Sequence, residues 1–179
     1  MTIDALLERV PAYARDLKLN LTNLLQQPEL TPQQTWGTAL ACAMAARNDD
    51  LLAAVAQQAR QQLPETVFAA AQAAAAIMGM NNVYYRFQHL CSNERYKTIP
   101  ARLRMQVIRS HGSDPIDFEL WCLAVSAING CAACVDSHER VVREKGLTEE
   151  AVAAAIRLAA VIHALAAVLE AEETLGPPA

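Results

Sequence analysis

Runs of alanine recur along this chain, most densely over residues 69–76 and again over residues 151–169. Alanine has the highest helix propensity of all residues, and its small side chain lets helices pack closely. Only 5% of the residues are aromatic, although 53% are hydrophobic. The chain therefore favours an all-α fold and excludes most all-β architectures.

Length and charge limit the class of protein further. The 179 residues are enough for a single domain with its own hydrophobic core, which we take as residues 1–179. The net charge is −4 and no run of basic residues occurs, so we expect no nucleic-acid partner. The N-terminus has no basic region followed by an apolar stretch, so we expect a cytoplasmic protein without a signal peptide.

The most apolar segment, residues 151–169, contains Arg157 and His163. Both side chains are costly at the centre of a bilayer. We therefore expect a buried core helix rather than a membrane span, with His163 as a core histidine whose hydrogen bonds are satisfied.

Helix-start and helix-stop signals divide the chain into segments. Thr31 stands before a proline and Asn48 before an aspartate, while Thr148 stands before two glutamates. These are typical helix N-caps, and Gly79 and Gly146 are expected to end helices. The expected helices cover residues 6–21, 31–46, 48–62, 63–78, 116–128, 131–145 and from 148 onward, with an irregular segment over 91–115.

The two halves of the chain are similar when one is shifted by 84 residues. The shift places residues 63–65 on 147–149 and the alanines of 69–76 on 153–160. This pattern predicts a duplicated helical unit, with one repeat over 28–90 and the other over 112–174.

A cysteine pair stands at the expected start of the helix over 131–145. Cys131 and Cys134 form a CxxC, and His138 follows four residues later. On a helix these three side chains share one face, spread over roughly 60°. The helix N-terminus favours thiolate, and an imidazole one turn on can accept or return a proton. The pattern indicates thiol chemistry.

Three other interpretations remain open. A CxxC is half of a zinc site, but the remaining cysteines are isolated and supply no second pair. A thioredoxin-type CxxC requires strands, which the sequence does not indicate. The pair can also be two core cysteines beside a satisfied histidine.

Glu119 lies twelve residues before Cys131, on the preceding helix. A break at Asn129 and Gly130 folds that helix back antiparallel, so the Glu119 carboxylate could reach the thiols directly or through water. The alternative is a solvated surface glutamate.

The full pattern, Glu-x11-Cys-x2-Cys-x3-His, resembles that of the alkyl hydroperoxide reductases of the AhpD type, in the carboxymuconolactone decarboxylase-like superfamily. The resemblance covers nearly the whole chain and rests also on residues 11–21, 36–38, 76–86, 118–121 and 127–131. It implies an all-helical protein of duplicated units, a homotrimer in which residues 112–174 are the catalytic repeat. It further implies reduction of organic hydroperoxides by dihydrolipoyl groups, a co-substrate, with no bound cofactor or metal.

The resemblance also implies a role for each residue of the pattern. Cys134 attacks the peroxide and becomes a sulfenic acid. Cys131 donates a proton to the leaving alkoxide and then closes the disulfide, while His138 and Glu119 form the proton relay. Family members carry a histidine just before the second cysteine, whereas this chain has Ala133, so the relay must work without it.

The implied partners are the peroxiredoxin AhpC, linked through a mixed disulfide at Cys131, and a dihydrolipoyl-bearing acyltransferase. Two alternative functions remain. One is a redox adaptor that passes electrons from dihydrolipoamide-bearing proteins to a peroxiredoxin, with little peroxidase activity of its own. The other is a helical protein of the lactone decarboxylase type without redox chemistry, against which the CxxC argues.

A polar and aromatic group follows the alanine run over 69–76. It contains Asn81, Asn82, Tyr84, Tyr85 and Arg86. These residues could lie near a pocket or a subunit contact. We favour a capping turn whose aromatic side chains pack on the core.

Overall fold

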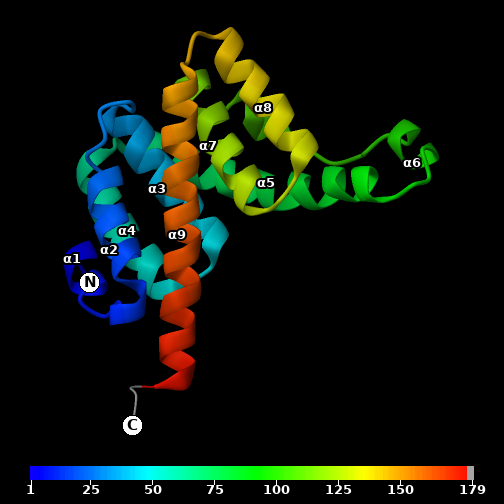
Figure 1. The fold of residues 1–179 in the computed structure, drawn as a ribbon. Helices are drawn as coiled ribbons and strands as arrows, with labels where there is room; N and C mark the ends of the chain where they lie inside the picture. Colours follow the sequence, from blue (N-terminus) through cyan, green and yellow to red (C-terminus); the bar gives the residue numbers. More distant parts are fainter. Residues whose placement is uncertain (177–179) are drawn as a thin grey trace.

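The structure, a computed structural model, describes residues 1–176. Within these residues it contains helices and loops and no β-strand (Figure 1). The all-α prediction is therefore confirmed. The α-helices are α1 (Ile3–Leu7), α2 (Arg15–Leu24), α3 (Pro32–Ala46), α4 (Asp49–Gln62), α5 (Glu65–Leu90), α6 (Arg95–Thr98), α7 (Pro115–Ile128), α8 (Ala132–Glu144) and α9 (Glu149–Leu175), with short 3-10 helices η1 (Ala12–Ala14) and η2 (Gln106–Arg109).

The predicted caps begin the helices as expected. Thr31 Oγ1 accepts from the backbone N–H of Gln34, and the Gln34 side chain accepts from that of Thr31, which together form a capping box at the start of α3. Asn48 caps α4 and Thr148 caps α9 in the same way through their side-chain oxygens. These local bonds are readable from sequence because each joins residues three positions apart.

Two of the expected helices differ from the structure. The helix expected over 6–21 is divided into α1, η1 and α2, because Pro11 has an extended backbone and disfavours a helical residue before it.

The second difference is at the end of α5. Helix α5 does not end at Gly79 but continues to Leu90, and Asn81 and Asn82 are buried inside it rather than in a capping turn. A glycine costs a helix only about 1 kcal/mol relative to alanine, and Gly79 is not among the residues with positive φ. The extension of α5 carries polar side chains past the end of α7.

Helix α9 lies against α2, α3 and α7 (Figure 1). It is long and apolar enough to cross a membrane by length and composition, but half of its most apolar window is buried in the protein. This agrees with the expected core helix. His163 is exposed on its outer side, so the expectation of a core histidine is wrong: the alternation of buried and exposed positions on α9 turns it outward.

Helices α3 and α7 pack closely where Trp121, which is fully buried, lies against Gly37. Helices α5 and α9 begin at Glu65 and Glu149, which matches the 84-residue shift, although the duplication itself stays a prediction. Beyond the body of helices, the far end of α5 and the short α6 extend outward (Figure 1), before the chain returns through η2 to α7.

Candidate active site

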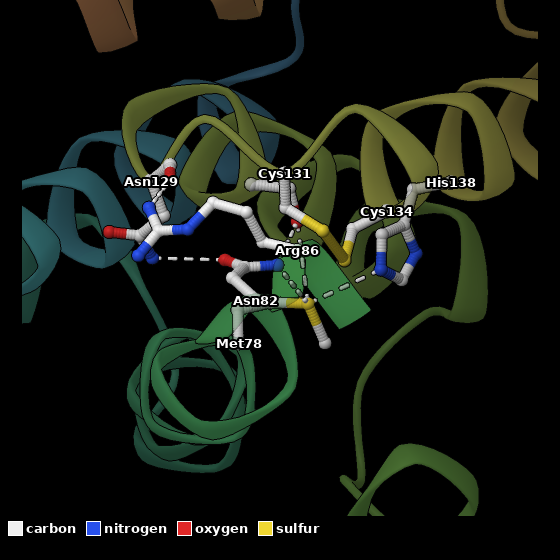
Figure 2. The surroundings of a disulfide bond; sticks show 8 residues. Met78, Asn82, Arg86, Asn129, Cys131, Cys134 and His138 are labelled. Carbon is white, nitrogen blue, oxygen red and sulfur yellow. Dashed lines mark hydrogen bonds between the residues drawn. A yellow bond between two sulfur atoms is a disulfide. The ribbon is translucent and has the colours of Figure 1, made fainter. Parts of the chain in front are cut away.

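The cysteine pair lies where α7 turns back into α8. Cys131 is the N-cap residue of α8 and Cys134 lies in its first turn. The two are joined by a disulfide, with their Cα atoms 5.3 Å apart (Figure 2). The pair is therefore disulfide-capable, and the absence of strands in residues 1–176 removes the thioredoxin alternative. No group of three or more His, Cys, Asp or Glu side chains within the same residues could hold a metal ion.

A tight turn presents the disulfide. Gly130 has a φ of +66°, in the left-handed region that glycine adopts without steric cost. The backbone N–H of Cys131 donates to the carbonyl of Ser126 at 3.1 Å, and the carbonyl of Cys131 accepts from the N–H of Val135 at 2.9 Å. The turn therefore stops α7 and starts α8 within a few residues.

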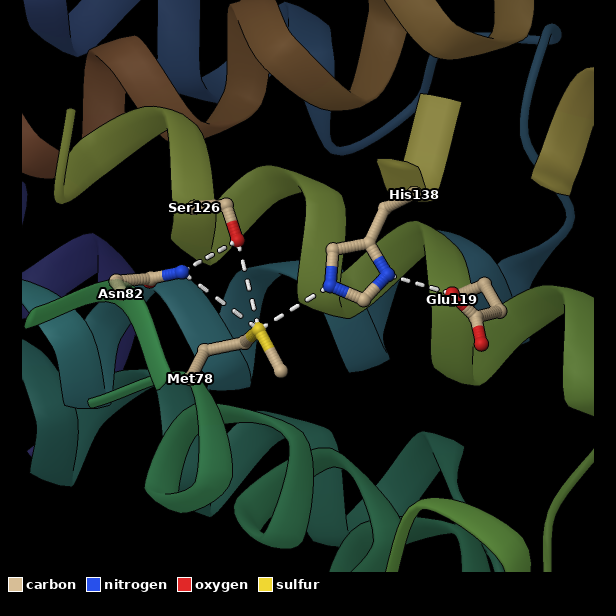
Figure 3. Close-up of polar contacts among 5 residues, drawn as sticks. All are labelled: Met78, Asn82, Glu119, Ser126 and His138. Atoms are coloured by element: carbon tan, nitrogen blue, oxygen red, sulfur yellow. Dashed lines mark hydrogen bonds and ion pairs between the residues drawn. The ribbon is translucent and has the colours of Figure 1, made fainter. Parts of the chain in front are cut away.

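The structure brings Glu119 and His138 together. His138 Nδ1 lies 2.5 Å from Glu119 Oε2, and both side chains are mostly buried, with exposed fractions of 14% and 18% (Figure 3). Glu119 is therefore not a solvated surface residue. It meets His138, whose ring lies beside Cys134 (Figure 2).

The other ring nitrogen of His138 has a neighbour that sequence analysis did not single out. Its Nε2 atom lies 3.3 Å from the sulfur of Met78, a buried residue of α5 (Figure 3). A thioether sulfur is a weak hydrogen-bond acceptor that holds no proton near neutral pH. His138 is thus fixed between a carboxylate on one side and a group that cannot titrate on the other.

A cavity of about 380 Å³ opens onto this arrangement. Cys134 contributes to its wall, whereas Cys131 does not and is fully buried. Ala133, at the position of the family histidine, also lines the wall. The remaining lining residues are Met78, Asn81, Tyr85, Met105, Ile108, Glu119, Ser137, His138 and Val141.

Asn81 and Tyr85 line this cavity. For these two residues the interpretation that they lie near a pocket is therefore correct, and the favoured interpretation as a capping turn is wrong. Met105 and Ile108 come from the irregular segment before α7. Neither was expected, because the cavity wall joins segments distant in sequence. The signal that was available was the helical spacing of residues 78, 81 and 85, once α5 is continued past Gly79.

Other cysteine and histidine side chains in the described part of the chain are less suited to this chemistry. Burial raises the pKa of the Cys122 thiol, and the nearby Glu119 charge raises it further. Burial raises the pKa of Cys42 in the same way. His111 stacks on Phe118 at 4.0 Å between ring centroids, and burial lowers its pKa.

Comparison with known proteins agrees with the residue pattern. A model of the carboxymuconolactone decarboxylase family matches residues 94–175. The chain is 63% identical over 172 residues to "Alkyl hydroperoxide reductase AhpD" of Solibacter usitatus, covering 96% of this chain and 97% of that protein. It is 59% identical over 180 residues to the protein of the same name from Acidobacterium capsulatum, covering 100% and 98%. It is 55% identical over 177 residues to the protein of the same name from Koribacter versatilis, covering 98% of this chain and 91% of that protein.

These identities extend over almost the full length of both chains in each comparison. The resemblance inferred from Glu119, Cys131, Cys134 and His138 is therefore confirmed, and the chain belongs to the AhpD family.

Proposed function

We propose that this protein is an antioxidant thiol peroxidase that reduces alkyl and lipid hydroperoxides to alcohols. The observation that carries the proposal is the position of Cys134, which lines a cavity beside the His138–Glu119 pair while Cys131 lies buried behind it. The name of the relatives, alkyl hydroperoxide reductase, supports the same activity. The cavity walls are largely apolar, which suits an alkyl chain.

The reaction begins with thiolate formation at Cys134. Glu119 accepts from His138 Nδ1–H, which leaves Nε2 without a proton and able to take that of the thiol. The Met78 sulfur, 3.3 Å from Nε2, can then accept from the Nε2–H that forms. The position of Cys134 in the first turn of α8 further favours the anion. The thiolate attacks the terminal oxygen of the hydroperoxide, the O–O bond breaks, and Cys134 becomes a sulfenic acid.

Cys131 completes the oxidative half-reaction. Its thiol gives a proton to the leaving alkoxide, which departs as the alcohol. The resulting Cys131 thiolate attacks the sulfenic sulfur of Cys134, the disulfide forms, and the released hydroxide takes the proton held by His138 to leave as water. Two thiols and one hydroperoxide thus give one disulfide, one alcohol and one water.

A dihydrolipoyl group, carried by an acyltransferase, restores the dithiol as a co-substrate rather than a bound cofactor. Its first thiolate attacks Cys134, because Cys134 is the sulfur that lines the cavity, and Cys131 leaves. Its second thiol then closes the lipoyl ring and releases Cys134. A mixed disulfide with the peroxiredoxin AhpC at Cys131 requires the turn at Gly130 to open, since Cys131 is fully buried.

We further propose a cytoplasmic homotrimer. Support for self-association comes from exposed large apolar side chains on the outer part of α5 and on the segment that follows. These are Val83, Phe87, Leu90, Tyr96 and Ile99. Apolar side chains gathered on one extension are typical of a protein contact surface.

A turnover assay with dihydrolipoamide and cumene hydroperoxide tests the function. The protein and its Cys91→Ser variant, which changes a cysteine outside the site, should consume peroxide at equal rates, whereas Cys134→Ser should consume none. Slow peroxide consumption together with rapid reduction of an oxidised peroxiredoxin would establish the adaptor function instead. Failure in both assays would refute the proposal.

A further inference from the structure

We propose that Asn82 is a positioning residue for the cysteine pair: its hydrogen bonds hold the turn before Cys131 in the conformation that favours the Cys131–Cys134 disulfide. The biological importance of this effect rests on the proposed function. The effect itself is a property of the disulfide equilibrium and can be measured without peroxide.

Asn82 is a fully buried amide in the middle of α5. Its Nδ2 donates to Ser126 Oγ at 2.9 Å, and its Oδ1 accepts from Asn129 Nδ2 at 2.9 Å. Both partners belong to the end of α7 and the turn that follows. A buried amide without hydrogen-bond partners is strongly unfavourable, so these two bonds fix the turn against α5.

The same partners connect directly to Cys131. The carbonyl of Ser126 accepts the backbone N–H of Cys131 at 3.1 Å. The carbonyl of Asn129 accepts from Arg86 Nη1, one helical turn beyond Asn82 on α5, at 2.5 Å (Figure 2). Side chains of α5 therefore hold two residues of the segment that presents Cys131.

The same hydrogen-bond network also reaches His138, the base of the proposed mechanism. Asn82 Nδ2 lies 3.7 Å from the sulfur of Met78, and Ser126 Oγ lies 3.5 Å from it. That sulfur contacts His138 Nε2 at 3.3 Å (Figure 3). Asn82 thus lies between the turn that carries the first cysteine and the histidine that follows the second.

These bonds are all formed with the disulfide closed. A disulfide requires Cα atoms about 4.4–6.8 Å apart, and the turn held by this network keeps those of Cys131 and Cys134 at 5.3 Å. Without the bonds of Asn82 to Ser126 and Asn129, the reduced turn is free to adopt conformations in which the two sulfur atoms cannot meet, so closing the disulfide costs more conformational entropy. The network consequently stabilises the oxidised form relative to the reduced form.

The test is the equilibrium of the disulfide with dithiothreitol, followed by thiol alkylation and mass measurement. Asn82→Leu keeps the approximate size of the side chain and removes both hydrogen bonds. The matched control is Asn48→Leu, which removes a buried asparagine that caps α4 through the Leu51 N–H and donates to Glu170. Both variants should lower the melting temperature.

Of these two variants, only Asn82→Leu should change the equilibrium constant of the disulfide. The expected change is at least about fivefold toward the dithiol, equivalent to ~20 mV for a two-electron couple. Ser126→Ala removes one of the two partners and should shift the equilibrium in the same direction by about twofold. This second variant provides the test if Asn82→Leu does not fold.

Equal equilibrium constants for the wild type, Asn82→Leu and Ser126→Ala would overturn the proposal and leave Asn82 a residue of the core. A shift in Asn48→Leu as large as that in Asn82→Leu would overturn it as well. A protein that shows the expected shifts but reduces no peroxide would refute the proposed function while the role of Asn82 stands.

Discussion

The contact of Gly37 with Trp121 predicts that two identical substitutions have opposite effects. A Cβ added at Gly37 would lie 2.2 Å from Trp121 Cε2 and 2.3 Å from Cζ2. Carbon atoms in ordinary contact lie about 3.5–4.0 Å apart. Gly37→Ala therefore requires α3 and α7 to separate by about 1.3–1.8 Å or Trp121 to leave its site. At Gly79, in the exposed part of α5, an added Cβ meets nothing within 4 Å.

Overpacking of a core costs about 1–3 kcal/mol or more, and the severity of this contact places Gly37→Ala at about 3 kcal/mol. In a chain of this size 1 kcal/mol shifts the melting temperature by about 2–4 °C, so we expect a fall of about 6–12 °C in differential scanning calorimetry. Gly79→Ala gains helix propensity of about 0.5–1 kcal/mol and should raise the melting temperature by about 1–4 °C. A Gly37→Ala variant that melts with the wild type would show that α3 and α7 are not packed as described.

Two further predictions concern the cysteines and the relay. Glu119→Gln and His138→Phe should each slow peroxide reduction by at least about tenfold in stopped-flow measurements, because a positioned acid or base is worth about 10²–10⁴ in rate. The double variant should lose less than the product of the two effects, because groups in one relay fail together, and independent effects would argue against a relay. In native oxidised protein at pH 8, iodoacetamide should modify Cys91 but neither Cys42 nor Cys122, because burial raises the pKa of both thiols. Modification of all three in peptide mass spectrometry would contradict that burial.

The sequence was informative where structure depends on neighbours in the chain. The N-caps at Thr31, Asn48 and Thr148 and the turn at Gly130 follow from bonds between residues a few positions apart. The alignment of Cys134 with His138 on α8 follows from helical periodicity. The approach of Glu119 to the site follows from the short turn after α7, because such a turn makes α8 run back along α7.

The sequence was uninformative where a contact joins distant segments. Sequence signals predict the end of α5 at Gly79 because glycine weakens a helix, but packing of α5 against α7 outweighs that cost. Met78 and Asn82 could not be assigned to the site for the same reason, since their partners lie on α7 and α8. His163 was expected in the core from the apolar character of α9, although its place in the helical period faces outward.

The most direct test of the account is the chemical state of each sulfur after one hydroperoxide equivalent. Reduced Cys131→Ser and Cys134→Ser variants are mixed with cumene hydroperoxide and dimedone, and peptide masses are measured. We predict a dimedone adduct on Cys134 in Cys131→Ser, because the attacking sulfur has lost its resolving partner, and no adduct on Cys131 in Cys134→Ser. An adduct on Cys131 with Cys134 unmodified would reverse the assignment of the two sulfurs, and no adduct in either variant would contradict peroxide reduction at this site.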